Sequence, residues 1–175
     1  LITRIRSMAL VHEQLYRSED FSRIEFKAYL ETLINHILLS FEGSAYVQVS
    51  VNATGVVMGL DSAVPCGLLI TELVTNAFKY AFPDGRPRSG AGSCELAVSA
   101  EWDNTAYTLT VADNGVGLPA DMDWRNTKTL GLVLVRMIGQ HQLQGQIELD
   151  RSCGTTFRLR FEPRTMDVRR TMKEE

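Results

Sequence analysis

Residue types that build disulfide and metal frameworks are scarce in this sequence of 175 residues. It has three cysteines, which are far apart and form no Cys-x-x-Cys pair, and three histidines. These counts exclude a disulfide scaffold, argue against a structural zinc site and fit a reduced, cytoplasmic setting. Positive charge is not in excess, since 18 Lys and Arg stand against 21 Asp and Glu. The net charge of −3 argues against nucleic acid as the main ligand.

A long hydrophobic run is missing as well. The longest stretch without a charge, residues 43–60, alternates polar and apolar side chains, which is typical of a strand and not of a membrane span. The chain also lacks a signal-peptide pattern. Residues 1–5 resemble the interior of a helix, so we expect that a segment of a longer protein precedes them. That parent protein could carry a membrane anchor, whereas we expect no membrane contact from this segment.

Two common nucleotide-binding signatures are absent. The sequence contains no Gly-x-Gly-x-x-Gly and no Gly-x-x-x-x-Gly-Lys-[Ser/Thr], which excludes Rossmann and P-loop sites. What the sequence does have is an ordinary globular composition, with 45% hydrophobic and 22% charged residues. The length predicts one domain with a short helical appendage.

Apolar spacing predicts two helices before residue 42. A heptad-like seam runs from Leu1 to Leu15 and includes His12. A capping box at residues 22–25 then starts a second apolar stripe, from Phe26 to Phe41. The pattern is typical of an appendage that packs on a partner helix. The alternative is that both helices belong to the main core.

The rest of the chain mixes strands and helices. Alternating segments separated by short turns predict antiparallel strand pairs, and Pro65 is expected in the first turn of a long helix. Residues 82–92 and 119–129 are predicted loops. The order predicts an α/β fold in two layers, with a mixed sheet and helices on one face. The predicted strands are 47–51, 56–60, 96–100, 107–111, 146–149 and 155–161, and the predicted helices are 65–81 and 130–143.

Three polar residues share one face of the predicted long helix. Glu72, Asn76 and Lys79 lie at positions i, i+4 and i+7, within roughly 60° of arc. An amide oxygen suits Mg²⁺, an ammonium can pair with phosphate, and a carboxylate can accept a proton or orient a nucleophile. The pattern indicates a site for a metal-bound triphosphate. The alternative is a solvated face with a charge pair.

A second candidate site follows the predicted strand 107–111. Asp113 and the glycines of Asn114-Gly115-Val116-Gly117 stand where that strand ends. The glycines would let the backbone approach a flat ligand closely, and the carboxylate would accept a hydrogen bond from an amino group. The alternative is an ordinary tight turn.

Four segments in fixed order resemble the N, G1, G2 and G3 boxes of the ATP-binding domain shared by gyrase, HSP90, histidine kinases and MutL. The resemblance covers about residues 45–163 and implies a Bergerat-type two-layer sandwich. Residues 4–30 and 65–86 are similar to sensor histidine kinases of the HisKA_2 type. The four boxes are Glu72-Leu-Val-Thr-Asn-Ala-Phe-Lys-Tyr80, Asp113-Asn-Gly-Val-Gly-Leu-Pro119, Thr129-Leu-Gly-Leu132 and Gly154-Thr-Thr-Phe157.

The resemblance also implies roles for individual residues. At the phosphates, Asn76 would be the Mg²⁺ ligand, and Glu72 would be the polar or basic residue near the γ-phosphate. Lys79 would lie beside the phosphates, and the helix start at Leu130, Gly131 and Leu132 would approach them. Those at the adenine would be Asp113, with Thr155 or Thr156 acting through a water, over a floor shaped by Gly115 and Gly117. Lys128 and Arg136 are candidate phosphate contacts, with plain surface charge as the alternative. The loop before the G2 box predicts a short ATP lid.

At the level of function, the resemblance implies the catalytic part of a two-component sensor histidine kinase that uses ATP and Mg²⁺. Residues 1–41 would be the end of a dimerisation domain, 42–163 the ATP-binding domain and 164–175 a charged tail. The expected partners are a response regulator receiver domain and a second copy of the full protein. We expect the phospho-acceptor upstream of Leu1, because His12 lies on the inward seam. The alternatives are a nucleotide-sensing module without phosphotransfer and a serine-directed kinase of the anti-sigma type.

Overall fold

A computed structural model of the chain describes residues 23–41, 46–83 and 92–163. Its centre is a five-stranded sheet in the order β2-β4-β5-β7-β6. β2 runs parallel to β4, while the β4–β5, β5–β7 and β6–β7 pairs are antiparallel. This confirms the predicted mixed, mostly antiparallel sheet. The strands are β2 (Val47–Asn52), β4 (Cys94–Trp102), β5 (Tyr107–Asp113), β6 (Gln146–Asp150) and β7 (Thr155–Phe161).

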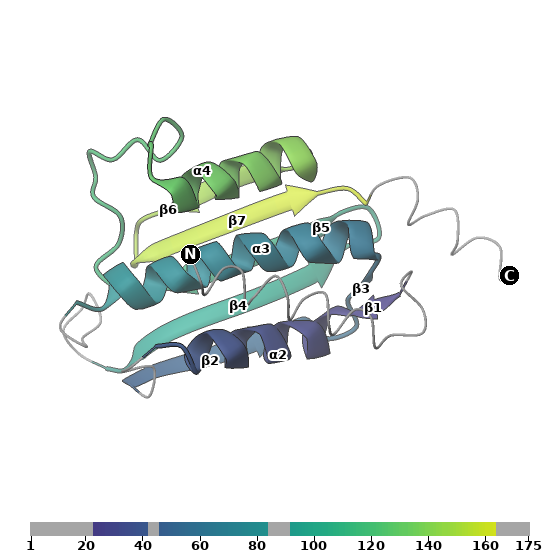
Figure 1. Ribbon diagram of the computed structural model, residues 1–175, viewed down its shortest axis with the longest axis horizontal. Coiled ribbons are helices and arrows are strands. Elements are labelled where there is room, and N and C mark those ends of the chain that lie inside the picture. Colours follow the sequence, from purple (N-terminus) through teal and green to yellow (C-terminus); the bar gives the residue numbers. More distant parts are fainter. Residues whose placement is uncertain (1–22, 42–45, 84–91, 164–175) are drawn as a thin grey trace, which may run out of the picture.

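Three helices cover one face of this sheet, as Figure 1 shows. They are α2 (Phe26–Leu38), α3 (Leu60–Asn76) and α4 (Leu130–Arg136), and π-helical turns extend α3 as η2 (Ala77–Ala81) and α4 as η3 (Met137–Gln142). Alternate strand residues such as Leu96 and Val98 are almost fully buried beneath the helices, whereas their neighbours Glu95 and Ala97 are exposed on the other face. The predicted two-layer α/β fold is therefore confirmed.

Helix α2 packs inside the same hydrophobic core as α3. Phe26 and Leu30 are 0% exposed, and α2 contacts both α3 and β2. We expected this helix in an appendage that packs on a partner helix, with the main core as the alternative. The packing of α2 shows that the expectation is wrong for residues 26–38, because the helix buries its apolar face against α3 and β2. The seam from Leu1 to Leu15 lies outside the described residues, as does the tail 164–175.

The start of α2 differs from the predicted capping box. Glu25 itself is the N-cap, and its carboxylate accepts the backbone N–H of Ala28 at 2.8 Å. The helix therefore begins at Phe26 rather than directly after residue 22, so the capping box is wrong. The reason is that the backbone of β1 (Ile24–Glu25) is taken up by antiparallel pairing with β3 (Val57–Met58).

Helix α3 begins five residues before Pro65. The carbonyl oxygen of Gly59 accepts the backbone N–H groups of Ser62 (3.1 Å) and Ala63 (2.9 Å), which starts the helix at Leu60. Pro65 therefore lies inside the helix, and the predicted strand 56–60 shrinks to β3. Glycine gives a weak N-cap signal because it has no side chain to accept a hydrogen bond, whereas proline is a strong signal for a first turn.

The remaining elements lie where the pattern predicted them. Asp103 closes the β4–β5 hairpin by accepting the backbone N–H groups of Thr105 (2.9 Å) and Ala106 (2.8 Å) through Oδ1. The predicted helix 130–143 corresponds to α4 with η3, and the last strand pair to β6 and β7. In the described part of the chain no helix has both the length and the hydropathy to cross a bilayer.

Candidate functional site

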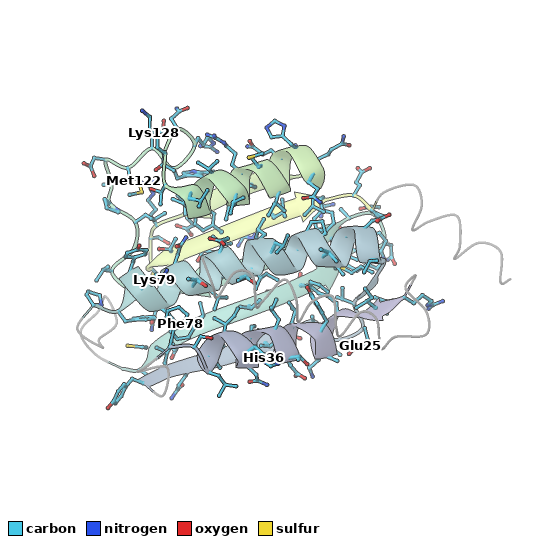
Figure 2. All side chains as sticks on the ribbon, in the orientation of Figure 1. Glu25, His36, Phe78, Lys79, Met122 and Lys128 are labelled. Atoms are coloured by element: carbon cyan, nitrogen blue, oxygen red, sulfur yellow. The ribbon has the colours of Figure 1, made fainter. Side chains whose placement is uncertain are left out.

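A cavity of about 400 Å³ lies where α3, β5, β7 and the loop before α4 meet. Figure 2 shows Met122, which lines it, at the same end of the molecule as Lys79 and Lys128. The walls are mainly apolar, with a few polar side chains such as Asn76, Asp113 and Thr155. The lining residues are Leu73, Asn76, Ala77, Tyr80, Ala81, Val111, Asp113, Val116, Gly117, Leu118, Pro119, Met122, Thr129, Leu132, Thr155 and Phe157.

Asp113 is the buried acid of this cavity. It is the last residue of β5 and only 8% exposed. Its Oδ1 accepts the backbone N–H groups of Gly115 (3.0 Å) and Thr155 (3.2 Å). Burial raises the pKa of Asp113, although the hydrogen bonds from Gly115 and Thr155 oppose the rise. A carboxylate has about four lone-pair positions, so Asp113 can accept a further hydrogen bond from a ligand.

Asn76 brings an amide group to the opposite wall. It is the last residue of α3, half-buried, and lines the cavity one turn after the buried Glu72. Glu72 is 4% exposed and does not itself line the cavity. Lys79 lies in η2 and is exposed, beyond the lining residues. The three residues thus share one side of the α3–η2 helix, but they sit at different depths.

Gly131 lies at a close contact between α4 and the side chains on this side of α3. A methyl group at Gly131 would lie 3.0 Å from Oε2 of Glu72 and 3.4 Å from Nδ2 of Asn76. The absence of a Cβ atom at residue 131 therefore lets the start of α4 sit against both side chains without displacing them. This contact brings the first N–H groups of α4 close to Asn76.

Gly115 makes a second close approach, between the loop after β5 and the end of η2. A Cβ atom at Gly115 would overlap the carbonyl oxygen of Ala81. That same oxygen accepts the backbone N–H of Val116 at 2.8 Å. The glycine therefore lets the loop close one end of the cavity, although Gly115 is not itself a lining residue.

The structure gathers some of the predicted site residues around one cavity and leaves others outside it. Asn76, Asp113, Gly117, Leu132 and Thr155 line it. Thr156 does not, because it follows Thr155 in β7 and its side chain points to the other face of the sheet. Glu72, Lys79, Gly115, Leu130 and Gly131 are also not lining residues, and neither are Lys128 and Arg136. His12 lies outside the described residues.

The apolar walls of the cavity were not predicted from the sequence. Tyr80, Leu118, Met122 and Phe157 line the cavity but appeared only as parts of predicted boxes or loops. Tyr80 is 65% exposed in spite of its size. The exposure of Tyr80 is visible only in the structure, so the one signal in the sequence was its position next to Lys79 in the segment that also carries Asn76.

Comparisons with known proteins agree with this geometry. Residues 62–165 match the family model described as "Histidine kinase-, DNA gyrase B-, and HSP90-like ATPase", and residues 1–41 match the HisKA_2 model described as "Histidine kinase". Among curated proteins, the blue-light-activated histidine kinase 2 of Erythrobacter litoralis is 35% identical over 111 residues, which are 63% of this chain and 30% of that protein. The sensor histidine kinase PdtaS of Mycobacterium tuberculosis is 32% identical over 150 residues, 83% of this chain and 28% of that protein. The chain therefore spans less than a third of the length of these relatives.

Solved structures show the same fold. The histidine kinase domain of the Erythrobacter litoralis EL346 blue-light-activated histidine kinase superposes with a TM-score of 0.79 at 24% identity, covering 95% of this chain and 80% of that one. The Acinetobacter baumannii histidine kinase AdeS superposes with a TM-score of 0.61 at 22% identity, covering 94% and 78%.

Proposed function

The chain belongs to the histidine kinase-, DNA gyrase B- and HSP90-like ATPase family, and we propose that it is the catalytic part of a sensor histidine kinase that binds Mg-ATP in the cavity between α3 and the loop before α4. The observation that carries this proposal is that Asp113 and Asn76 line one cavity. An acceptor for an amino group and a hard oxygen ligand thus face a common space. That space has the volume of a typical small-molecule site.

The adenine would bind at the Asp113 end. Its exocyclic amino group would donate to the Asp113 carboxylate, whose position is fixed by the backbone of Gly115 and Thr155. The apolar side chains of Met122 and Phe157 would cover the flat faces of the base. Of the two threonines that the sequence offered as support, Thr155 is favoured because it lines the cavity.

The phosphates would bind at the Asn76 end. Asn76 would supply an amide oxygen to Mg²⁺, which supplies charge stabilisation to the phosphates. The described residues hold no cluster of three His, Cys, Asp or Glu side chains fit for a metal ion. The remaining ligands would therefore be phosphate oxygens and water, as is usual for Mg²⁺. The exposed Lys79 would pair with a phosphate, and the N–H groups at Leu130, Gly131 and Leu132 would favour its negative charge.

Glu72 would act next to the transferred group. Its carboxylate lies against Gly131, at the junction of α3 and α4, and would accept or orient the proton of the attacking histidine. In the transfer, a histidine nitrogen would form a bond to the γ-phosphorus as the bond to the β–γ bridging oxygen breaks, and ADP would leave. Positioning would supply most of the catalysis.

The partners belong to the same proposal. The acceptor histidine would lie upstream of Leu1, and the phosphohistidine would serve the aspartate of a response regulator receiver domain. The full protein would form a homodimer through the predicted apolar seam of residues 1–15, which lies within the part that matches the HisKA_2 model, whereas α2 packs in the core of this chain. The ATP-binding domain was expected at residues 42–163, but α2 packs in the same core as α3, so this domain would begin at β1 and end at residue 163, with 164–175 as a charged tail. A cytoplasmic setting is proposed for this part of the protein.

The test is phosphotransfer from γ-labelled ATP with Mg²⁺, on this chain and on a version extended upstream through the whole first helix. We expect acid-labile, base-stable label on the extended chain alone, lost in Asn76→Ala and kept in the control His141→Gln. Label on the short chain that is lost in His12→Gln would move the acceptor to His12. Acid-stable label would indicate a serine kinase, and ATP binding without label would indicate a nucleotide-sensing module.

A further inference from the structure

Arg151 holds the loop that forms one wall of the cavity. It is the first residue after β6, and its guanidinium donates to three backbone carbonyls of that loop. The hydrogen bonds are Nη1 to Pro119 (3.0 Å), Nη1 to Ala120 (3.0 Å) and Nη2 to Met122 (2.7 Å). One side chain thus satisfies three acceptors on a loop that is about thirty residues away in sequence.

A buried aromatic residue anchors the same loop a few residues later. Trp124 is 3% exposed and packs edge-on against Phe157 of β7, with ring centroids 5.5 Å apart. The guanidinium of Arg125 lies over the outer part of this indole, 4.9 Å from the ring centroid. The loop is therefore attached at two points to the β6–β7 hairpin, by Arg151 and by Trp124.

The anchored loop lines the cavity, whereas Arg151 does not. Leu118, Pro119 and Met122 are lining residues, and Arg151 binds the carbonyls of two of them. A change at Arg151 therefore acts on a ligand only through the position of the loop. Thr155, on the other side of the same β6–β7 turn, holds Asp113.

We propose that Arg151 is a positioning residue that fixes residues 118–126 as a preformed wall of the nucleotide site, before any ligand binds. The proposal rests on the proposed function only in naming the ligand as an adenine nucleotide. Ordering a loop during binding lowers affinity, because the lost conformational freedom opposes association. A loop held by Arg151 in the free protein avoids that loss.

Arginine suits this task better than lysine. Its planar guanidinium carries five N–H donors in a fixed arrangement, which allows one group to reach three carbonyls. The three donors of a lysine ammonium radiate from a single atom, so Arg151→Lys should keep only part of the contacts. Loop exchange and ADP affinity in Arg151→Lys should therefore lie between those of wild type and Arg151→Ala. A purely steric role of residue 151 would not produce this order.

The experiment compares Arg151→Ala and Arg151→Lys with wild type and with the control Arg158→Ala. Arg158 is an exposed arginine of β7 that faces Glu148 at 3.7 Å, away from the cavity. Backbone amide exchange is followed in the free protein for Met122 and Asn126, whose N–H groups donate to Pro119 (3.1 Å) and Asp123 (3.2 Å). The affinity for ADP with Mg²⁺ is measured by titration calorimetry on the same samples.

The proposal predicts slow exchange at Met122 and Asn126 in wild type and in Arg158→Ala. In Arg151→Ala the same amides should exchange at least about tenfold faster, with the β4–β5 hairpin unchanged, and ADP should bind about tenfold more weakly. Arg151→Lys should lie between the two, and it keeps the test decisive if Arg151→Ala does not fold. Wild-type exchange in both variants would overturn the anchoring, and a looser loop with unchanged ADP affinity would overturn the positioning role. Absence of ADP binding in wild type would contradict the proposed function, while the exchange data would still decide the anchoring.

Discussion

Thr155 donates its backbone N–H to Oδ1 of Asp113 across the β5–β7 ladder, at a distance of 3.2 Å. The strand register places these two residues opposite each other at the ends of their strands, with Thr156 paired to Ala112 on the other face. The geometry of the acid is therefore set by the pairing of β5 with β7 in the central sheet, and not by a loop alone.

Replacing Asp113 should lower the affinity for ADP without lowering the free energy of unfolding. In Asp113→Asn, the amide oxygen can still accept the N–H groups of Gly115 and Thr155, but the position that would face the adenine amino group becomes an uncharged NH₂ donor that cannot accept its hydrogen bond. We expect the affinity for ADP to fall about 10- to 100-fold, the usual value of a hydrogen bond to a charged group. Since burial disfavours the carboxylate, the free energy of unfolding at neutral pH should be unchanged or higher.

Titration calorimetry and urea unfolding measure the two quantities. Asp121→Asn is the matched control, because Asp121 is an exposed residue of the neighbouring loop and does not line the cavity. Equal ADP affinity in Asp113→Asn and wild type would contradict the assigned role of Asp113.

Acidification should weaken adenosine binding. The raised pKa of Asp113 means that the folded chain keeps this proton to a higher pH than the unfolded chain does. The contribution of Asp113 to stability is thus full below its unfolded pKa and is lost as pH rises through the folded pKa. The affinity for adenosine should change in the opposite direction, because the adenine amino group would need the ionised carboxylate of Asp113 as its acceptor. The affinity should therefore rise as pH rises through the folded pKa of Asp113.

Adenosine is the suitable probe because it has no phosphate that titrates. Its affinity is measured by calorimetry across the acidic range on wild type and on Asp113→Asn. The variant should show a flatter pH profile than wild type, and parallel profiles for the two proteins would count against Asp113 as the titrating group.

A methyl group at the α3–α4 contact should be costly. In an uncrowded helix, Gly→Ala stabilises a protein by about 0.5–1 kcal/mol. In Gly131→Ala the new methyl group would lie 3.0 Å from Oε2 of Glu72, so we expect a loss of about 1–3 kcal/mol in the free energy of unfolding. In a Glu72→Ala background the same change should cost much less, and an equal cost in both backgrounds, measured by urea unfolding, would show that this contact is not responsible.

The interface between α2 and α3 gives a prediction about stability alone. The hydroxyl of Tyr29 is buried and has no hydrogen-bond partner within the described residues, whereas the hydroxyl of Tyr107 donates to the carbonyl of Val57 at 2.8 Å. Tyr29→Phe should leave the free energy of unfolding unchanged or raise it by about 1 kcal/mol, and Tyr107→Phe should lower it by about 1 kcal/mol or more. Urea unfolding of both variants checks the pair, and a clear loss in Tyr29→Phe would reveal a partner for that hydroxyl.

Much of the fold could be predicted from the sequence because its signals are local. Alternation in residues 96–100 and 107–111 predicted the central hairpin, whose strands extend to 94–102 and 107–113 in the structure. Asp113 was predicted just after a strand because the alternating pattern stops before it. Helical spacing likewise placed Glu72 and Asn76 on one side of a helix. The resemblance to a family supplied their proposed roles, which spacing alone did not.

What the sequence could not predict depends on contacts between distant segments. The start of α2 is set by strand pairing between residues 24–25 and 57–58, which no local pattern records. The contact of Glu72 with Gly131 joins residues that are about sixty positions apart in the sequence. Arg151 is an ordinary charged turn residue in the sequence, and its three carbonyl contacts appear only when the β6–β7 turn meets the loop before α4.

The most direct test of the central claim is a crystal structure of the chain with Mg²⁺ and a non-hydrolysable ATP analogue. The account predicts adenine in the cavity with its amino group donating to Asp113, and Mg²⁺ bound by the side-chain oxygen of Asn76 and by phosphate oxygens. A base bound away from Asp113, or Mg²⁺ bound without Asn76, would contradict it.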